Sequence, residues 1–181
     1  MVIFPYGGLC FKLRGKRTSV LINPYKKTAG GRLMSRARAE IVTISSFRYC
    51  SLERITGSPF VIQGPGEYEI KGVDIIGIPL GQTTAYLYEI DGFKICYLGD
   101  FVGELTEKQI EELGSVDILF LLANEKAVSI IDQLEPKVVI PMKATARFFR
   151  EIGQKEAKPL TKLTMSSSSL PEEREVVWLK R

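Results

Sequence analysis

Residues 86–121, YLYEIDGFKICYLGDFVGELTEKQIEELGSVDILFL, contain the change of pattern that decides the fold. Asp91 and Gly92 separate two alternating apolar runs, which predicts a β-hairpin with a two-residue turn. Thr106 and Gln109 have the spacing of a capping box at the start of a helix, and the apolar run VDILFLL after that helix predicts a buried strand. A hairpin that passes into strand–helix–strand order predicts a mixed sheet with helices packed on it.

The segments on either side extend this pattern. Short strands with intervening turns are expected on the amino-terminal side, at 9–14, 18–23, 40–45, 59–63 and 67–79. Helices and strands are expected to alternate on the carboxyl-terminal side, at 125–134, 137–142, 146–153 and 174–180. This order predicts two packed mixed sheets with helices outside, in one α/β or α+β domain over residues 1–181.

The composition is that of an ordinary globular protein, with 45% apolar and 25% charged residues. The first residues lack the basic stretch and apolar core of a signal peptide, and no apolar run approaches the roughly 18–20 residues that cross a bilayer. Three cysteines, Cys10, Cys50 and Cys96, are too few and too odd in number for a disulfide framework. We therefore expect a soluble, cytoplasmic protein without a membrane partner.

Positive charge is concentrated in the amino-terminal segment, which has no acidic residue before Glu40 although the net charge of the chain is only +4. Such a block attracts phosphates or acidic surfaces, or forms a solvated loop. Aromatic side chains do not alternate with the basic ones, as a platform for single-stranded nucleic acid would require. Nucleic acid or another anionic partner stays an open alternative, and the candidate contacts are Lys26, Lys27, Arg32, Arg36 and Arg38.

The stretches GPGEYEIKGV and ICYLGD, the latter followed by LTEKQIEELG, are the most specific of a series that runs from GGLCFKLRGKRTSVLINPY to SSSSLPEEREVVWL. In this order they resemble the metallo-β-lactamase-fold hydrolases, and within them the small lactonase-like zinc-dependent hydrolases. The resemblance covers nearly the whole chain. It implies a four-layer αββα sandwich of two mixed sheets with outer helices, and a metal site in loops along one edge of the sheets.

The resemblance also implies where the metal ligands would lie. The ligand motif of the family, His-x-His-x-Asp-His, directly follows the strand that here reads EIVTIS. Laid on this sequence, the ligand positions of the family are Ser46, Arg48, Cys50, Ser51, Gln82, Asp100 and Lys143. Asp100 alone matches the family, and the chain contains no histidine. Two nearby residue pairs also differ from the family pattern. Asn23-Pro24 stands where the family often has Asp-Pro, and Gly7-Gly8 stands where it has Gly-His.

These replacements disfavour a metal. A catalytic zinc ion is held by about three protein ligands, mostly histidine nitrogens and carboxylate oxygens. Arg48 and Lys143 would instead place positive charge where the dication should lie. We therefore expect no zinc and no other cofactor, and we expect Asp100 to form an ion pair with Arg48 or Lys143. In the alternative, Arg48 lies in solvent and Asp100 only caps its turn.

The favoured functional prediction is a pseudoenzyme that has lost its zinc site and acts as a binding or assembly module. A metal-dependent hydrolase with an unorthodox site at Asp100, Cys50 and Lys143 is the first alternative, and Arg48 could lower the pKa of the Cys50 thiol there. The basic block as an anion-binding surface is the second alternative. Homo-oligomerisation through a sheet edge stays open, because the loop at Leu80-Gly81-Gln82 is short.

Overall fold

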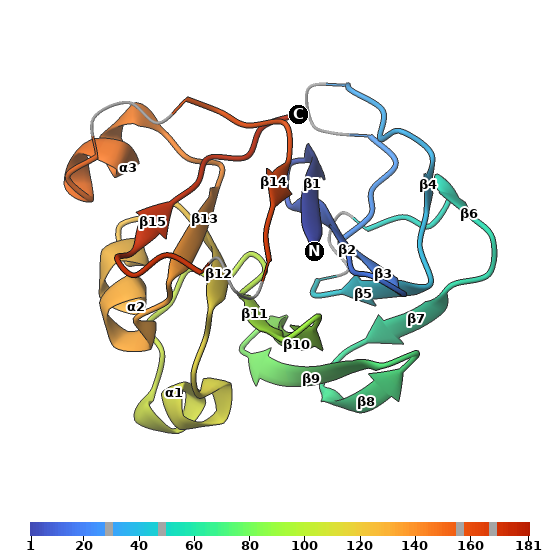
Figure 1. The fold of residues 1–181 in the computed structure, drawn as a ribbon, viewed down its shortest axis with the longest axis horizontal. Helices are drawn as coiled ribbons and strands as arrows, with labels where there is room; N and C mark the ends of the chain where they lie inside the picture. Colours follow the sequence, from blue (N-terminus) through green and yellow to red (C-terminus); the bar gives the residue numbers. More distant parts are fainter. Residues whose placement is uncertain (28–30, 47–49, 155–157, 167–169) are drawn as a thin grey trace.

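The computed structural model describes residues 1–27, 31–46, 50–154, 158–166 and 170–181. Two mixed β-sheets face each other, and the described helices lie on the outer side of one of them (Figure 1). The predicted sandwich of two mixed sheets with outer helices is thereby confirmed. No helix among the described residues is long and apolar enough to span a membrane.

The first sheet has six strands in the order β14-β1-β2-β3-β5-β7. Their bounds are β1 (Val2–Gly7), β2 (Cys10–Arg14), β3 (Ser19–Ile22), β5 (Ile41–Ile44), β7 (Phe60–Gln63) and β14 (Leu163–Thr164). Strands β1, β2 and β3 form an antiparallel meander, whereas β5 pairs in parallel with both β3 and β7. Every residue of β3 and β5 is buried, which is typical of strands covered on both faces.

The second sheet has seven strands in the order β15-β13-β12-β11-β10-β9-β8. Their bounds are β8 (Gly66–Ile70), β9 (Val73–Leu80), β10 (Thr83–Ile90), β11 (Phe93–Tyr97), β12 (Ile118–Leu122), β13 (Val138–Met142) and β15 (Glu175–Val176). The predicted hairpin joins β10 to β11, and Asp91 and Gly92 have φ values of 54° and 79°, as a type I′ turn requires. From β11 to β15 the neighbouring strands pair in parallel, which confirms the predicted βαβ order.

The helices α1 (Glu107–Leu113), α2 (Ala127–Leu134) and α3 (Ala146–Glu151) pack their apolar side chains on the outer face of the seven-stranded sheet. The predicted capping box starts α1, since Thr106 accepts from the Gln109 amide and the Gln109 side chain accepts from the Thr106 amide. The outer face of the six-stranded sheet is covered differently. The segments 24–27 and 31–39 and the short parallel pair β4 (Ala37–Arg38) and β6 (Ile55–Thr56) bury residues such as Met34 against it.

The main core lies between the two sheets and is rich in aromatic side chains. Tyr86, Tyr88, Phe93, Tyr97 and Phe120 are all at most 1% exposed. Each such ring removes about 150–250 Å² from water, so these rings are a major part of the hydrophobic stabilisation. The hydroxyl group of one of them, Tyr97, reaches the edge of the sandwich where the candidate site lies.

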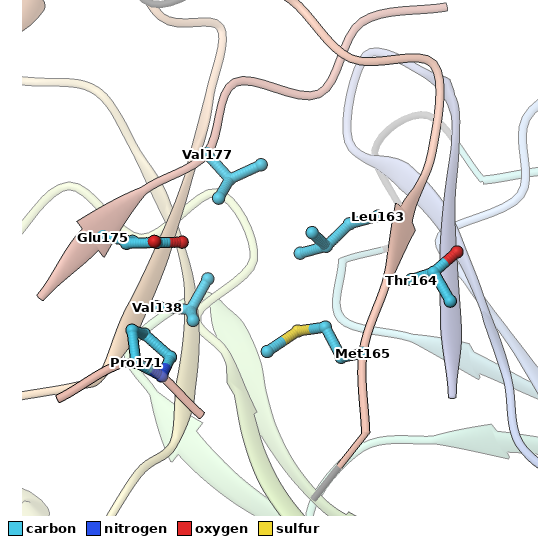
Figure 2. A pocket seen from close by; sticks show the side chains of 7 residues that line it. All are labelled: Val138, Leu163, Thr164, Met165, Pro171, Glu175 and Val177. Carbon is cyan, nitrogen blue, oxygen red and sulfur yellow. The ribbon is translucent and has the colours of Figure 1, made fainter. Parts of the chain in front are cut away.

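At the outer edges, β14 and β15 are only two residues long and leave a hollow of about 210 Å³ between the sheets. Figure 2 shows Val138 and Val177 on one side of this hollow, facing Leu163 and Met165 on the other. The strand predicted at 174–180 is therefore mostly irregular. Its continuation is held by single hydrogen bonds, such as that from the Val177 amide to the Val139 carbonyl at 2.8 Å.

Candidate functional site

The candidate site lies where four strands of the two sheets end. Asn23 follows β3, Ser45 follows β5, Asp100 follows β11 after two residues, and Lys143 follows β13. Because β3 and β5 are parallel in one sheet and β11 and β13 run in the same direction in the other, their carboxyl ends meet at one edge. The sequence predicted this edge as the site.

The side chain of Asn23 is the centre of a buried hydrogen-bond network. Its Nδ2 donates to Ser45 Oγ at 2.6 Å and to the Tyr97 hydroxyl at 2.8 Å. Its Oδ1 accepts from the Ser45 amide at 2.8 Å, and the Cys50 thiol lies 3.7 Å away. Asn23 has a φ of 47°, a left-handed conformation that asparagine tolerates better than most residues. The amide therefore joins the two sheets with every polar atom in use.

The Tyr97 hydroxyl continues this network by donating to the Leu9 carbonyl at 2.7 Å. Burial raises the pKa of Tyr97 well above its usual value, and the nearby charge of Asp100 adds to that rise. The phenol is therefore a neutral donor and not a base at neutral pH.

Beneath Asn23, the chain packs tightly around Ser45. The Ser45 carbonyl accepts from the Thr84 amide at 2.9 Å and from Thr83 Oγ1 at 3.1 Å. Gly99 has a φ of 66°, and a Cβ added there would lie 2.7 Å from Thr83 Oγ1 and 2.8 Å from Ser45 Oγ. No buried side-chain nitrogen or oxygen in the described part of the chain lacks a hydrogen-bond partner. The floor of the site is thus closed by the protein itself.

Cys50 is half-buried and its thiol donates to the Ser46 carbonyl at 3.0 Å. Burial, and after it the negative charge of Asp100, raise the pKa of Cys50 to about 11. The side chain is therefore a thiol at neutral pH, which disfavours both nucleophilic attack and metal ligation. Arg48, which was expected to have the opposite effect on this pKa, lies outside the described residues.

Asp100 and Lys143 do not pair. No ion pair between described residues involves Asp100, so the Lys143 form of the predicted pair is absent, and the Arg48 form falls outside the described residues. Lys143 is exposed with a φ of 54° and lines a separate cleft of about 340 Å³. The backbone leaves β13 in a direction that carries this side chain to the cleft.

The remaining predicted positions are part of ordinary loop structure. Gln82 is exposed in the two-residue turn between β9 and β10, which confirms that this loop is short. Ser51 is half-buried, its amide donates to the Pro24 carbonyl at 2.8 Å, and its hydroxyl accepts from the Glu53 amide at 3.3 Å. Ser46 is half-buried and supplies the carbonyl that holds Cys50.

The donor set does not fit a catalytic zinc ion. The chain contains no histidine, and the described residues include no group of three histidine, cysteine or acidic side chains close enough to hold a metal. Asp100 and a high-pKa thiol at Cys50 are fewer donors than the roughly three ligands of a catalytic zinc site.

Sequence reasoning missed part of this site. Tyr97 was not among the predicted site residues, because its role follows from a contact with Asn23 across 74 positions of sequence. The residues of the predicted basic block do not form one continuous surface. Lys26 pairs with Glu53 at 2.8 Å, and Arg32 lines the cleft. Arg32 is joined at the cleft by Lys143, Lys180 and Arg181. These three residues are distant from Arg32 in the sequence, and no local run of basic residues indicates that they lie together.

Two facing mixed sheets, helices outside and a loop site at the carboxyl ends of the strands define a metallo-β-lactamase type of sandwich. The chain belongs to the β-lactamase superfamily: its residues 3–143 match the sequence profile described as the beta-lactamase superfamily domain. The resemblance drawn from the sequence is confirmed.

Two relatives are similar along much of the chain. The UPF0173 metal-dependent hydrolase of Thermococcus onnurineus is 26% identical over 129 residues, which are 61% of this chain and 58% of the length of that relative. A crystal structure from Thermotoga maritima, described as a proposed zinc-dependent hydrolase of the metallo-β-lactamase superfamily, is 26% identical with a TM-score of 0.85, covering 99% of this chain and 98% of that one.

A more distant structure shares the fold alone. Igni18, a metallo hydrolase from Ignicoccus hospitalis, is 18% identical with a TM-score of 0.60, and the match covers 84% of this chain and 90% of that one.

Proposed function

We propose that this protein is a member of the metallo-β-lactamase superfamily that has lost zinc-dependent hydrolysis and acts as a binding or assembly module. The observation that carries the proposal is the Asn23 network. An amide that donates to Ser45 and Tyr97 and accepts from the Ser45 backbone occupies the place where the family often has an acidic residue.

The network argues against a metal on physical grounds. A cation near Asn23 would face the positive edge of its NH₂ group, whose two hydrogen bonds are 2.6 and 2.8 Å long. Turning the amide over would leave Ser45 and Tyr97 without their donor, and an unpaired buried polar group costs about 1–3 kcal/mol. A zinc ion held by Asp100 and a few hydroxyl groups would have to offset that loss.

Metal analysis tests the proposal directly. Protein purified without chelators is measured by inductively coupled plasma mass spectrometry and melted with and without zinc. We expect far less than one equivalent of metal and no change in Tm. A zinc ion bound at a hundredfold excess over its Kd would stabilise the fold by about 2.7 kcal/mol and raise Tm by several degrees.

A Cys50→Ser variant is the control for adventitious binding at the thiol. Close to one equivalent of zinc in both proteins, with a matching rise in Tm, would contradict the proposal. Loss of zinc in the variant alone would assign the metal to the thiol.

The names of the relatives favour a second candidate, because both are described as metal-dependent hydrolases. In this candidate, Asp100 and Cys50 form an unorthodox hydrolytic site, and Lys143, predicted as its third member, lies in the separate cleft. A panel of ester, lactone and phosphodiester substrates with added divalent metals, run on the native protein and on Asp100→Asn, separates the two. Turnover that disappears in Asp100→Asn would establish the hydrolase.

We place this role in the cytoplasm, because Cys10, Cys50 and Cys96 are all free thiols.

A further inference from the structure

The cleft that Lys143 lines is distinct from the Asn23 network. It holds about 340 Å³, within the range of small-molecule sites, and four separate segments build it. These are residues 5–8 at the end of β1 with Phe11, the pair Tyr25 and Arg32, the pair Lys143 and Ala144, and the segment 178–181.

The charge of this cleft is of one sign. Its lining includes four cationic side chains, Arg32, Lys143, Lys180 and Arg181, and no aspartate or glutamate. No ion pair between described residues involves Lys143, Lys180 or Arg181. The positive charge of these three side chains is therefore not neutralised by any described carboxylate.

Arg181 is held in place by uncharged groups. Its Nη1 donates to the carbonyls of Tyr6 at 3.3 Å and Leu33 at 3.4 Å, and its Nη2 donates to Ser35 Oγ at 2.5 Å. These bonds fix the guanidinium without cancelling its charge. A positioned cation of this kind stabilises an anion at a smaller entropic cost than a mobile one.

The other walls are aromatic. Trp178 packs on Phe149 with ring centroids 5.4 Å apart, and the Lys180 Nζ lies 5.5 Å from the centroid of the Trp178 ring. The Tyr25 hydroxyl donates to the Tyr6 carbonyl at 2.8 Å. These contacts hold both rings in place. Tyr25 is only 7% exposed, so the flat apolar surface beside the cations belongs to the partly exposed Trp178.

Two glycines, Gly7 and Gly8, also form part of the cleft wall. Gly7 has a φ of 108°, and a Cβ added there would lie 2.8 Å from the Tyr25 hydroxyl. Gly8 has a φ of 61° and nothing within 4 Å of where its Cβ would be. Gly8 therefore leaves backbone open at the cleft, which lets a ligand approach it closely, whereas Gly7 allows the close approach of the Tyr25 hydroxyl.

From these observations we infer that the cleft binds a small organic phosphate that carries a planar ring, such as a nucleoside monophosphate. Lys143, Lys180 and Arg181 surround the phosphate through charge-assisted hydrogen bonds, and the ring lies against Trp178. The inference rests on the proposed function as a binding module and gives that module a ligand class.

Calorimetric titration of the full chain in chelator and low salt tests the inference. The probes are AMP, ribose 5-phosphate and inorganic phosphate. We expect AMP to bind at least about tenfold more tightly than ribose 5-phosphate, because only AMP has the ring, and we expect each Kd to rise with salt. No heat with AMP at millimolar concentration, or equal affinity for all three probes, would overturn the inference.

Charge-reversal variants locate the site. Lys143→Glu and Lys180→Glu remove exposed side chains that lie in the cleft, so we expect folded proteins with AMP affinity lowered at least about tenfold. Lys94→Glu is the matched control, because Lys94 is equally exposed but does not line the cleft, and we expect less than a twofold change. Equal losses in all three variants would overturn the inference.

A single-stranded oligonucleotide that binds more tightly than AMP, and whose binding Lys143→Glu weakens, would also overturn it in favour of nucleic acid. Failure of the inference about the cleft can be distinguished from failure of the proposed function. The titration is run without metal, so absent AMP binding leaves the metal analysis untouched, and a zinc equivalent leaves the AMP result untouched.

Discussion

Replacing Asn23 by aspartate tests the network at the site. The substitution exchanges the Nδ2 group, which donates to Ser45 and Tyr97, for an oxygen that donates nothing. Ser45 can turn its hydroxyl to donate instead, but Tyr97 already donates to the Leu9 carbonyl and must abandon one acceptor. We expect Asn23→Asp to lower the free energy of unfolding by about 3 kcal/mol at pH 8, from one unpaired buried group and one buried carboxylate.

The loss should depend on pH with a definite sign. Burial and the nearby Asp100 both disfavour the ionised form of the new carboxyl, so its pKa in the folded protein is raised above the ordinary value of about 3.9. Destabilisation is then fully present above the raised pKa and fades as pH falls through it. Urea denaturation at pH 8 and pH 5 measures the difference, and the deficit relative to the native protein should be smaller at pH 5.

Asn124 provides the matched control, because it is the only other asparagine in the chain. Its Oδ1 accepts from the Lys126 amide at 2.8 Å just before α2, a role that a carboxylate keeps. Asn124→Asp should therefore change stability by less than about 0.5 kcal/mol. An Asn23→Asp protein that is as stable as the Asn124→Asp protein at pH 8 would refute the central role of Asn23.

Further predictions concern the packing, the acid stability and the thiol. Gly99→Ala should lower the free energy of unfolding by about 3 kcal/mol or more, and Gly81→Ala by about 1 kcal/mol, as measured in thermal melts. Both glycines have a left-handed φ (66° and 64°), but only a Cβ at Gly99 would meet other atoms within 2.8 Å. Equal losses would contradict the close packing around Ser45. Hydrogen bonds from the Ser19 hydroxyl and amide lower the pKa of Glu40 below its usual 4.5. The stabilisation they give is therefore present above pH 4.5 and is lost as pH falls. Glu40→Gln should flatten the dependence of the free energy of unfolding on pH between about pH 5 and pH 3, and an unchanged slope would refute this. Burial raises the pKa of Cys50 from 9.0 to about 11, so at pH 8 its thiol should react with iodoacetamide roughly 100-fold more slowly than in the unfolded chain. Peptide mass spectrometry measures the two reaction rates, and equal rates would show that the thiol is activated.

Local signals in the sequence predicted much of the fold. Asp91-Gly92 and the pair of Thr106 and Gln109 were recognised because a turn and a helix cap depend on neighbouring residues only. Of the family positions, Ser46, Cys50 and Asp100 lie near one another in the structure. These predictions required no knowledge of contacts between distant parts of the chain.

The features that failed or were missed depend on distant contacts. The ion pair of Asp100 with Arg48 or Lys143 was predicted from the family positions and from charge, but the backbone conformation of Lys143 carries its side chain to the cleft. The hydrogen bonds of Arg181 to Tyr6 and Leu33 cross 175 and 148 positions, which no local pattern indicates. The chemistry of the cleft could therefore be recognised only once the chain was folded.

The pairing of β1 with β14 has a consequence for synthesis of the chain. Val2 and Ile3 pair with Thr164 and Leu163, and the Met1 amino group donates to the Met165 carbonyl at 2.9 Å. During synthesis, β1 leaves the ribosome more than 150 residues before its partner β14. At about 5–20 residues per second, that edge stays uncovered for roughly ten to thirty seconds. A nascent chain of this protein should therefore engage chaperones through its first strand until β14 emerges.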